Sequence, residues 1–302
     1  MRVVGLLLLL CQVACVAPPD WQRDMQQALS ETRRAQQDLI VYFALPGRDA
    51  SDLMESRLGE PVVIAALQRG DFAAVIADGV KLKRLYGEWI GGGEGMGVCV
   101  LDGQGYCYAA RPGPQDPEQV AAFLDMCAAK RSDLADLRAK LQQATVSPLD
   151  QHALGCLLLD LGCRVHCEPL LIDAAMSGVA DSKHRLARLY ALDGNVQAAR
   201  RWLKASPRTP SAMLTEGYIL FKERRHAEAA KVLAEAVATK RLGPERQHAL
   251  LYLGKSLHEA KQEEEAIVML EALAAEGTGS TFEAAARHTL NHIYSPSQGH
   301  AH

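Results

Sequence analysis

Residues 38–54 read DLIVYFALPGRDASDLM, and this stretch decides the fold of the first part of the chain. Residues 39–45 form a nearly continuous apolar run, which is typical of a strand covered on both faces. A tight turn follows, and a helix is expected from Asp49. The stretch therefore predicts a buried strand that leads through a turn into a helix.

Regular structure is predicted on both sides of this stretch. Before it, one helix ending near Ala35 has an apolar face made of Trp21, Met25, Ala28, Leu29 and Thr32. After it, the pattern predicts a helix that restarts at Pro61, a strand over residues 72–76, a helix over 81–90, strands over 98–101 and 106–110, and a helix over 116–128. The glycines of residues 102–105 accept the positive φ of a hairpin turn. These elements predict an α/β domain with a mixed sheet and flanking helices.

Length and composition limit the class of protein. A chain of 302 residues is long enough for about two domains. The hydrophobic fraction of 48% and the charged fraction of 23% are those of a globular protein. A net charge of −3, with residues 81–84 (KLKR) as the densest basic run, excludes electrostatic attraction to nucleic acid.

The order of elements resembles the thioredoxin fold, and more closely the exported thioredoxin-like families in which a Trp-containing helix precedes the first strand. The most specific match is residues 91–113, GGGEGMGVCVLDGQGYCYAARPG. The resemblance covers residues 18–130. It implies a reactive cysteine pair after the first strand and a cis-proline beside that pair.

Both of these family features are absent. Gly47, Arg48, Asp49, Ala50 and Ser51 stand where the cysteines are expected, and none can supply the attacking thiolate. Met96, within EGMG at residues 94–97, stands at the place of the proline. We therefore expect a redox-inactive domain kept for packing or binding.

Two other roles are open for the degenerate turn. Arg48 or Ser51 could bind an anion at the helix N-terminus, where free N–H groups favour negative charge. Alternatively, Asp49 or Ser51 caps the helix.

An internal repeat organises residues 147–296. Gly155, Ala187, Gly217 and Gly254 align as anchors, with Cys167, Ala199, Ala229 and Ala266 twelve residues on, and Leu171, Leu203, Leu233 and Leu270 sixteen residues on. This pattern resembles tetratricopeptide and Sel1-like repeats, and implies an all-α solenoid of helix pairs. The small residues let two helices approach closely, and the leucine is expected to fill the seam with the following pair.

The segments around the repeats have their own predictions. Residues 131–146 are expected to form a connecting helix, with Leu134, Leu137 and Leu141 on one side, and Ser147 to cap the first repeat helix ahead of Pro148. Residues 282–294 would cover the last pair, and the tail at residues 297–302 is expected to be disordered.

The repeat resemblance also implies a peptide-binding concave face. Carried onto this sequence, the face contains Arg188, Tyr218, Phe221, Lys255 and His258, with Cys156, Leu159 and Ala191 at the equivalent positions. Cationic and aromatic side chains suit an extended partner that bears a carboxylate or apolar anchors. Alternatively, Tyr218 and Phe221 only pack against the neighbouring repeat.

Residues 1–17 have the composition of an export signal, with Arg2 followed by an apolar stretch and small residues. The stretch is too short to span a bilayer. Val13-Ala14-Cys15 resembles a lipobox, which predicts a signal over residues 1–14 and lipidation of Cys15. The alternatives are secretion after cleavage at Ala17 and an uncleaved N-terminus. The expected location is the periplasm, or the cell envelope as a membrane-anchored lipoprotein.

Export would permit disulfides among the remaining cysteines. The hairpin would allow a Cys99–Cys107 bond, and Cys156 could pair with Cys163 or Cys167; the alternative is that these cysteines, like Cys127, are small buried apolar residues. Cys163, His166 and Cys167 share a helix face, but a closed zinc site needs four ligands. No metal or cofactor is expected.

The leading hypothesis is a non-enzymatic, exported interaction or scaffold protein, in which the two domains bind a protein or peptide partner. The first alternative is a thiol-disulfide redox factor that uses Cys99 and Cys107. A second is an architectural lipoprotein of the envelope. No nucleic-acid partner is expected, and contact with a membrane would be made only through an N-terminal lipid.

Overall fold

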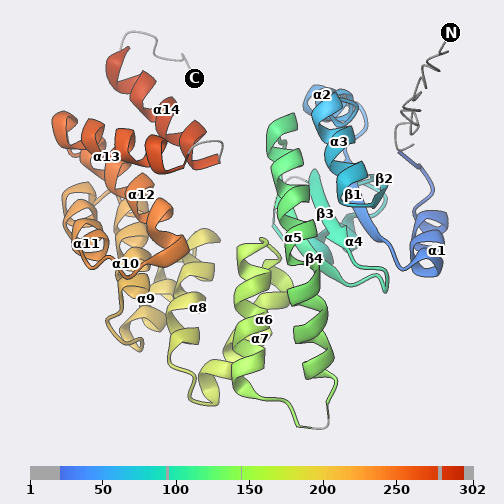
Figure 1. The fold of residues 1–302 in the computed structure, drawn as a ribbon, viewed down its shortest axis with the longest axis horizontal. Helices are drawn as coiled ribbons and strands as arrows, with labels where there is room; N and C mark the ends of the chain where they lie inside the picture. Colours follow the sequence, from blue (N-terminus) through green and yellow to red (C-terminus); the bar gives the residue numbers. More distant parts are fainter. Residues whose placement is uncertain (1–20, 93–94, 144, 278–280, 296–302) are drawn as a thin grey trace, which may run out of the picture.

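The computed structural model describes residues 21–92, 95–143, 145–277 and 281–295. The predicted export signal with Cys15, residue Glu94 and the predicted disordered tail lie outside the described residues. Figure 1 shows an α/β part on one side of the molecule and a succession of paired helices on the other. Within the described residues, no helix has both the length and the apolar character to cross a membrane.

The α/β part is built on a mixed four-stranded sheet with the order β2-β1-β3-β4. Its strands are β1 (Asp38–Ala44), β2 (Phe72–Asp78), β3 (Gly97–Leu101) and β4 (Cys107–Pro112). Strand β1 pairs parallel with β2 and antiparallel with β3, and β3 pairs antiparallel with β4. Every residue of β1 is buried, as its apolar run predicts.

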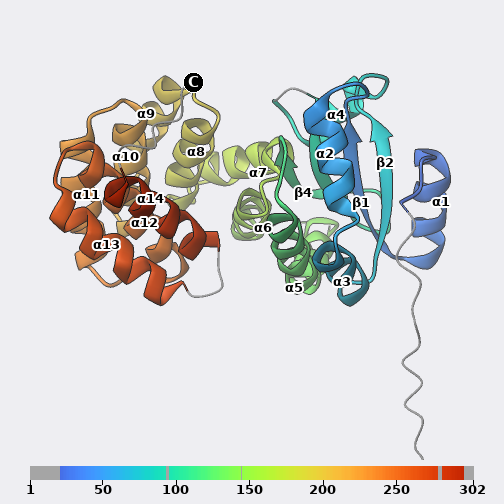
Figure 2. The ribbon, with the colours of Figure 1, turned by 90° about the horizontal axis from the view of Figure 1, so that it is seen from above.

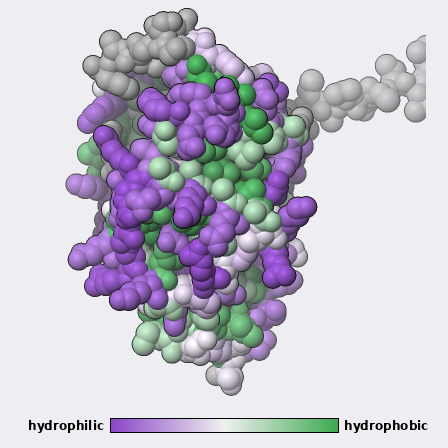
Figure 3. All heavy atoms as spheres, turned by 90° about the vertical axis from the view of Figure 1, so that its left-hand side faces the viewer, coloured by the Kyte–Doolittle hydropathy of each residue, from purple (hydrophilic) through white to green (hydrophobic). Residues whose placement is uncertain are grey.

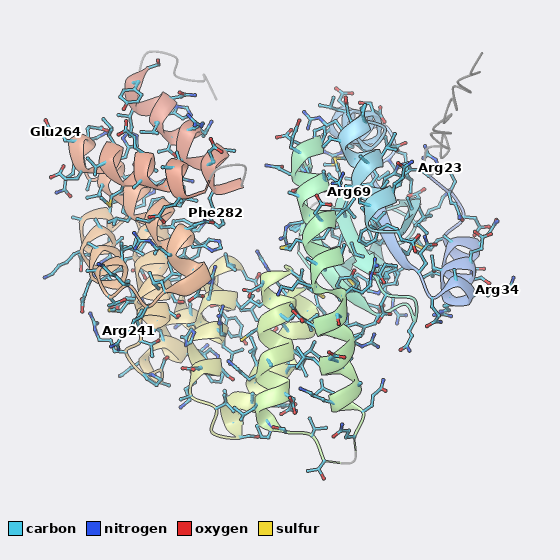
Figure 4. All side chains as sticks on the ribbon, in the orientation of Figure 1. Arg23, Arg34, Arg69, Arg241, Glu264 and Phe282 are labelled. Atoms are coloured by element: carbon cyan, nitrogen blue, oxygen red, sulfur yellow. The ribbon has the colours of Figure 1, made fainter. Side chains whose placement is uncertain are left out.

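Helices cover both faces of this sheet. They are α1 (Met25–Ala35), α2 (Asp49–Leu58), α3 (Pro61–Arg69), α4 (Lys83–Trp89) and α5 (Pro117–Leu141). On one face, Tyr42 of β1 contacts α2 through Ser51. On the other, Phe43 packs edge-on against Tyr86 of α4, with ring centroids 5.5 Å apart. Arg69 and Asp125 join α3 to α5 with a contact of 2.8 Å (Figure 4).

Helix α5 differs from the sequence-based prediction. The predicted closing helix over residues 116–128 and the predicted connecting helix over 131–146 form one continuous helix of 25 residues. Its N-terminal half covers the sheet, and its C-terminal half packs beside α6 (Figure 1). The reason is that residues 117–141 contain no internal proline or glycine that would end a helix.

The second part consists of helix pairs. Their bounds are α6 (Pro148–Asp160), α7 (Arg164–Met176), α8 (Asp181–Leu192), α9 (Val196–Lys204), α10 (Pro210–Lys222), α11 (His226–Ala238), η1 (Gly243–Glu245), α12 (Arg246–Glu259), α13 (Glu263–Glu276) and α14 (Thr281–Tyr294). Ser147 caps α6, accepting a hydrogen bond from the Leu149 backbone. Helices α8, α10, α12 and α14 contact one another in succession and form an inner row (Figure 2).

Small residues set the close approach within each pair. A Cβ atom added at Gly155, Gly217 or Gly254 would lie 2.8, 2.4 or 2.6 Å from Cγ of Leu171, Leu233 or Leu270, respectively. The leucine sixteen residues after the glycine therefore packs on that glycine within the same pair. The sequence-based prediction had placed this leucine in the seam with the following pair. For these three repeats that prediction is wrong.

We expect Gly217→Ala to lower the free energy of unfolding by about 1–3 kcal/mol, because the added methyl must displace the fully buried Leu233. In this net value, the cost of the steric clash exceeds the gain of about 1 kcal/mol that alanine brings over glycine in helix propensity. Gly87→Ala in α4 is the control, since its Cβ would meet nothing within 4 Å. Urea unfolding measures both. If Gly217→Ala stabilises the protein as much as Gly87→Ala does, the close approach is unimportant.

The first helix pair and the sheet share one hydrophobic core, which runs from Leu39 of β1 to Leu189 of α8. The turn between α6 and α7 docks on the edge of β4, where the Ala110 amide donates to the Leu161 carbonyl at 3.1 Å. The Arg111 guanidinium also donates to the Leu161 carbonyl, at 2.9 Å, and lies over the Phe123 ring. We call this contact of residues 161–163 with β4 the sheet–repeat junction. It makes the α/β part and the first pair one packed unit.

Candidate functional site

The turn before α2 cannot perform thiol chemistry, and its side chains have structural roles. Ser51 is fully buried and its Oγ accepts from the Leu45 amide at 2.9 Å. The N-cap position is occupied by Arg48, which makes no side-chain capping bond, while Gly47 has a φ of 79°. The prediction that Asp49 or Ser51 caps the helix is therefore wrong. Ser51 is also too deeply buried to meet an external anion.

The position of the missing cis-proline is filled. Met96 is buried, and its carbonyl accepts a hydrogen bond of 3.2 Å from the Tyr86 hydroxyl. The buried side chain packs in the core of the α/β part. Met96 therefore acts in packing.

All six cysteines of the described residues are free thiols. The predicted Cys99–Cys107 bond is not formed, because Cys99 lies opposite Ala110 and Cys107 lies opposite Leu101, with an irregularity in the register between them. Neither predicted Cys156 bond is formed. The Cys156 thiol contacts the His152 ring at 3.5 Å, and the Cys167 thiol donates to the Arg164 carbonyl.

Burial makes these thiols poor nucleophiles. It raises the pKa of Cys107, Cys127 and Cys167 well above the ordinary range, and raises the pKa of Cys156 to about 11. Thiolate, the reactive form, is therefore scarce at neutral pH. His166 packs against the Tyr106 ring, with centroids 5.0 Å apart. No group of three or more potential metal ligands occurs in the part of the chain that the structure describes.

Arg188 of the predicted concave face is already paired. Its guanidinium lies 2.8 Å from a Glu245 carboxylate oxygen, and Arg185 lies 3.1 Å from the same oxygen. The Ser211 hydroxyl also hydrogen-bonds to this carboxylate. Glu245 therefore neutralises much of the positive charge of Arg188, which the sequence-based prediction had expected to contact a ligand.

The remaining predicted aromatic residues are brought together with a residue that the prediction missed. Tyr252 of α12 packs edge-on against Tyr218, at 4.8 Å between centroids, and against Phe221, at 5.6 Å. Lys222 lies over the Tyr218 ring at 5.4 Å. We call Tyr218, Phe221, Lys222, Tyr252 and Lys255 the aromatic–lysine cluster. Tyr218 is 7% exposed, so it also has the packing role that was the alternative.

The two lysines of this cluster lack a negative partner. Burial and the charge of Lys222 lower the pKa of Lys255. Neither lysine has a carboxylate within ion-pair distance among the described residues. By contrast, His258, one helical turn after Lys255 in α12, is paired with Glu263 at 2.8 Å.

A small cavity lies beside the cluster. Its volume is about 40 Å³, and it is lined by Arg188, Leu192, Leu214, Thr215, Tyr218, His248 and Tyr252. That volume holds about one water molecule, so the cavity is too small to admit a polypeptide.

Sequence reasoning could have found part of this cluster. Tyr252 lies one helical turn before Lys255, and Lys222 directly follows Phe221, so both are near the predicted face. Glu245 lies in the short segment between two helix pairs, where the repeat pattern predicts no ligand-facing residue. Only the fold brings it to Arg188.

In comparisons with known proteins, no protein-family model matches the chain, and no curated protein matches it. The class of protein is defined by the structure alone. It is a small mixed α/β sheet domain joined to a series of helix pairs, compatible with a thioredoxin-like domain followed by helical repeats.

Proposed function

We propose that this protein is a non-enzymatic interaction protein, in which a redox-inactive thioredoxin-like domain supports a tetratricopeptide-like solenoid that binds an extended, acidic polypeptide segment. The observation that carries the proposal is the aromatic–lysine cluster on the inner row. Lys222 and Lys255 repel each other there beside three aromatic rings.

Electrostatics favours an acidic ligand. A carboxylate placed between the two lysines would relieve their repulsion, and a partly dehydrated surface strengthens such a contact. The edges of Phe221 and Tyr252 supply apolar contacts for the neighbouring residues of the ligand. Because Arg188 is already paired with Glu245, we assign the preference for an acidic ligand to Lys222 and Lys255.

The outer surface of the later repeats gives less support for binding. Figure 3 shows this side covered mainly by hydrophilic side chains, with hydrophobic ones in small groups. Small groups of exposed apolar residues are ordinary on protein surfaces.

Selection from a random peptide library tests the proposal. We expect enrichment of acidic peptides, and we expect Lys255→Glu to weaken binding of a selected peptide by about 10- to 100-fold, as reversal of a contacting charge does. Fluorescence polarisation with the labelled peptide measures this, and added salt should weaken binding to the wild type.

Lys231→Glu is the matched control, because Lys231 is exposed on α11 and makes the same change of net charge outside the inner row. Equal loss of binding in the two variants would mean that net charge, rather than the cluster, attracts the peptide. Selection of peptides without acidic residues would contradict the proposal directly.

The redox alternative is less well supported. Cys99 and Cys107 are 0% and 1% exposed, and burial raises the pKa of the Cys107 thiol. Export and lipidation of Cys15 remain part of the proposal, and their test is labelling with a fatty acid that is lost in Cys15→Ser.

A further inference from the structure

Two thiols meet at the sheet–repeat junction. Cys163, the N-cap residue of α7, donates from Sγ to the carbonyl oxygen of Cys107 in β4 at 3.3 Å. The Cys107 thiol itself donates to the Trp89 carbonyl at 3.6 Å and to the Ala109 carbonyl at 3.7 Å. Both Cys107 and Cys163 are almost fully buried, at 1% and 0% exposure.

We infer that Cys107 and Cys163 are a disulfide site, which forms when the chain folds in an oxidising environment and links the α/β part to the first helix pair. The two residues come from different elements, so the hydrogen-bond ladder of the sheet does not fix their separation. This pairing was absent from the sequence-based predictions.

The competing Cys99–Cys107 pair is disfavoured by register. Since Leu101 lies opposite Cys107, Cys99 is a diagonal neighbour two residues further along β3. Diagonal neighbours in a sheet are about 7–8 Å apart, whereas disulfide-bonded Cβ atoms are about 3.5–4.5 Å apart. A bond between Cys99 and Cys107 would therefore require the strands to move.

The chemistry is an exchange with an external disulfide, such as oxidised glutathione or a protein disulfide. One cysteine thiolate attacks this disulfide, forms a mixed disulfide and releases one external thiol. The second cysteine thiolate then attacks the protein sulfur of the mixed disulfide, and the second external thiol leaves. The two protein thiols lose two electrons and two protons, and the external disulfide becomes two thiols.

The timing follows from burial. In the folded protein both sulfur atoms are excluded from water, and burial raises the pKa of Cys107. Exchange therefore takes place while the chain folds and the thiols are still accessible. Once closed, the bond is equally shielded from reductants.

The test compares the full chain refolded in a glutathione redox buffer with the chain refolded under reductant. Digestion with trypsin and with a protease that cuts before aspartate separates the cysteines, because Asp102 lies between Cys99 and Cys107 and Asp160 lies between Cys156 and Cys163. Because trypsin does not cut the Arg111–Pro112 bond, mass spectrometry should find residues 102–115 linked to residues 160–164 in the oxidised sample only.

The bond would close a loop of about 56 residues. We expect the oxidised wild type to melt roughly 10 °C above the reduced form. Cys163→Ala should melt at the same temperature in both buffers, whereas Cys99→Ala should keep both the link and the shift. Absence of the Cys107–Cys163 link after oxidative refolding, or a link between Cys99 and Cys107, would overturn the inference, and the peptide map of the wild type decides this even if a variant fails to fold.

Discussion

Gly162→Ala is expected to lower the free energy of unfolding by about 3–5 kcal/mol, because it both strains the backbone and creates a steric clash at the sheet–repeat junction. Gly162 has a φ of +80°, where a side chain costs about 1–2 kcal/mol. Its added Cβ would also lie 2.4 Å from the Ala110 carbonyl oxygen. Relief of that clash separates the turn from β4 and removes the hydrogen bonds that Ala110 and Arg111 make to Leu161.

Gly194→Ala separates the two contributions. Gly194 has a φ of +77°, nearly the same as Gly162, yet its Cβ would meet nothing within 4 Å. We expect this variant to lose only the backbone term of about 1–2 kcal/mol. Urea unfolding of both variants measures the difference. If both variants lose the same free energy of unfolding, the close contact of Gly162 with β4 does not contribute to stability.

Acid is expected to destabilise the protein steeply between about pH 6.5 and pH 4. Burial is the main cause that lowers the pKa of both His184 and His248 to about 4, and the nearby guanidinium groups of Arg185 and Arg188 add to it. The unfolded chain, with an ordinary histidine pKa of about 6.5, therefore binds more protons over this range. Each ring stabilises the folded state above pH 6.5 and loses up to about 3 kcal/mol of that contribution by pH 4.

Glu245 acts in the same direction, since Arg185 and the Ser211 hydroxyl help to lower its pKa below the ordinary value, and its protonation below that value also weakens the folded state. The Nδ1 of buried His184, which has no hydrogen-bond partner, fits the same interpretation, because burial and Arg185 outweigh the opposing charges of Glu245 and Asp181.

Urea unfolding at a series of pH values measures the slope. His184→Gln and His248→Gln should each flatten the fall in stability between pH 6.5 and pH 4, whatever their effect at pH 7. An unchanged slope in the double variant of His184 and His248 would assign the acid sensitivity to other groups.

Most helices and strands were predictable, because short-range sequence patterns determine them. The buried run at residues 39–45 became β1, the hairpin glycines separated β3 from β4, and the anchors Gly155, Gly217 and Gly254 mark the close approach of paired helices. In each case the constraint lies within a few residues or within one helix pair. The sequence-based prediction divided α5 into two helices, although residues 118–141 contain no proline or glycine that would end a helix.

The candidate site was only partly predictable. Tyr218, Phe221 and Lys255 followed from the repeat register, but Tyr252 and Lys222 complete the cluster, and His258 is already paired with Glu263. The pairing of Arg188 with Glu245 joins residues 57 positions apart. No periodic pattern contains such a pair, since its distance depends on how three helix pairs stack.

By itself, the amino-acid sequence determined which segments form strands and helices, and that no thiol stands at the start of α2. These properties depend on residue type and short-range spacing. The tertiary structure alone decided that Glu245 neutralises Arg188 and that the first helix pair shares the core of the sheet. It also decided that the Cys163 thiol meets the Cys107 carbonyl, while Cys99 lies opposite Ala110. Those outcomes depend on contacts between distant segments, which are fixed only when the apolar surfaces of the whole chain are buried together.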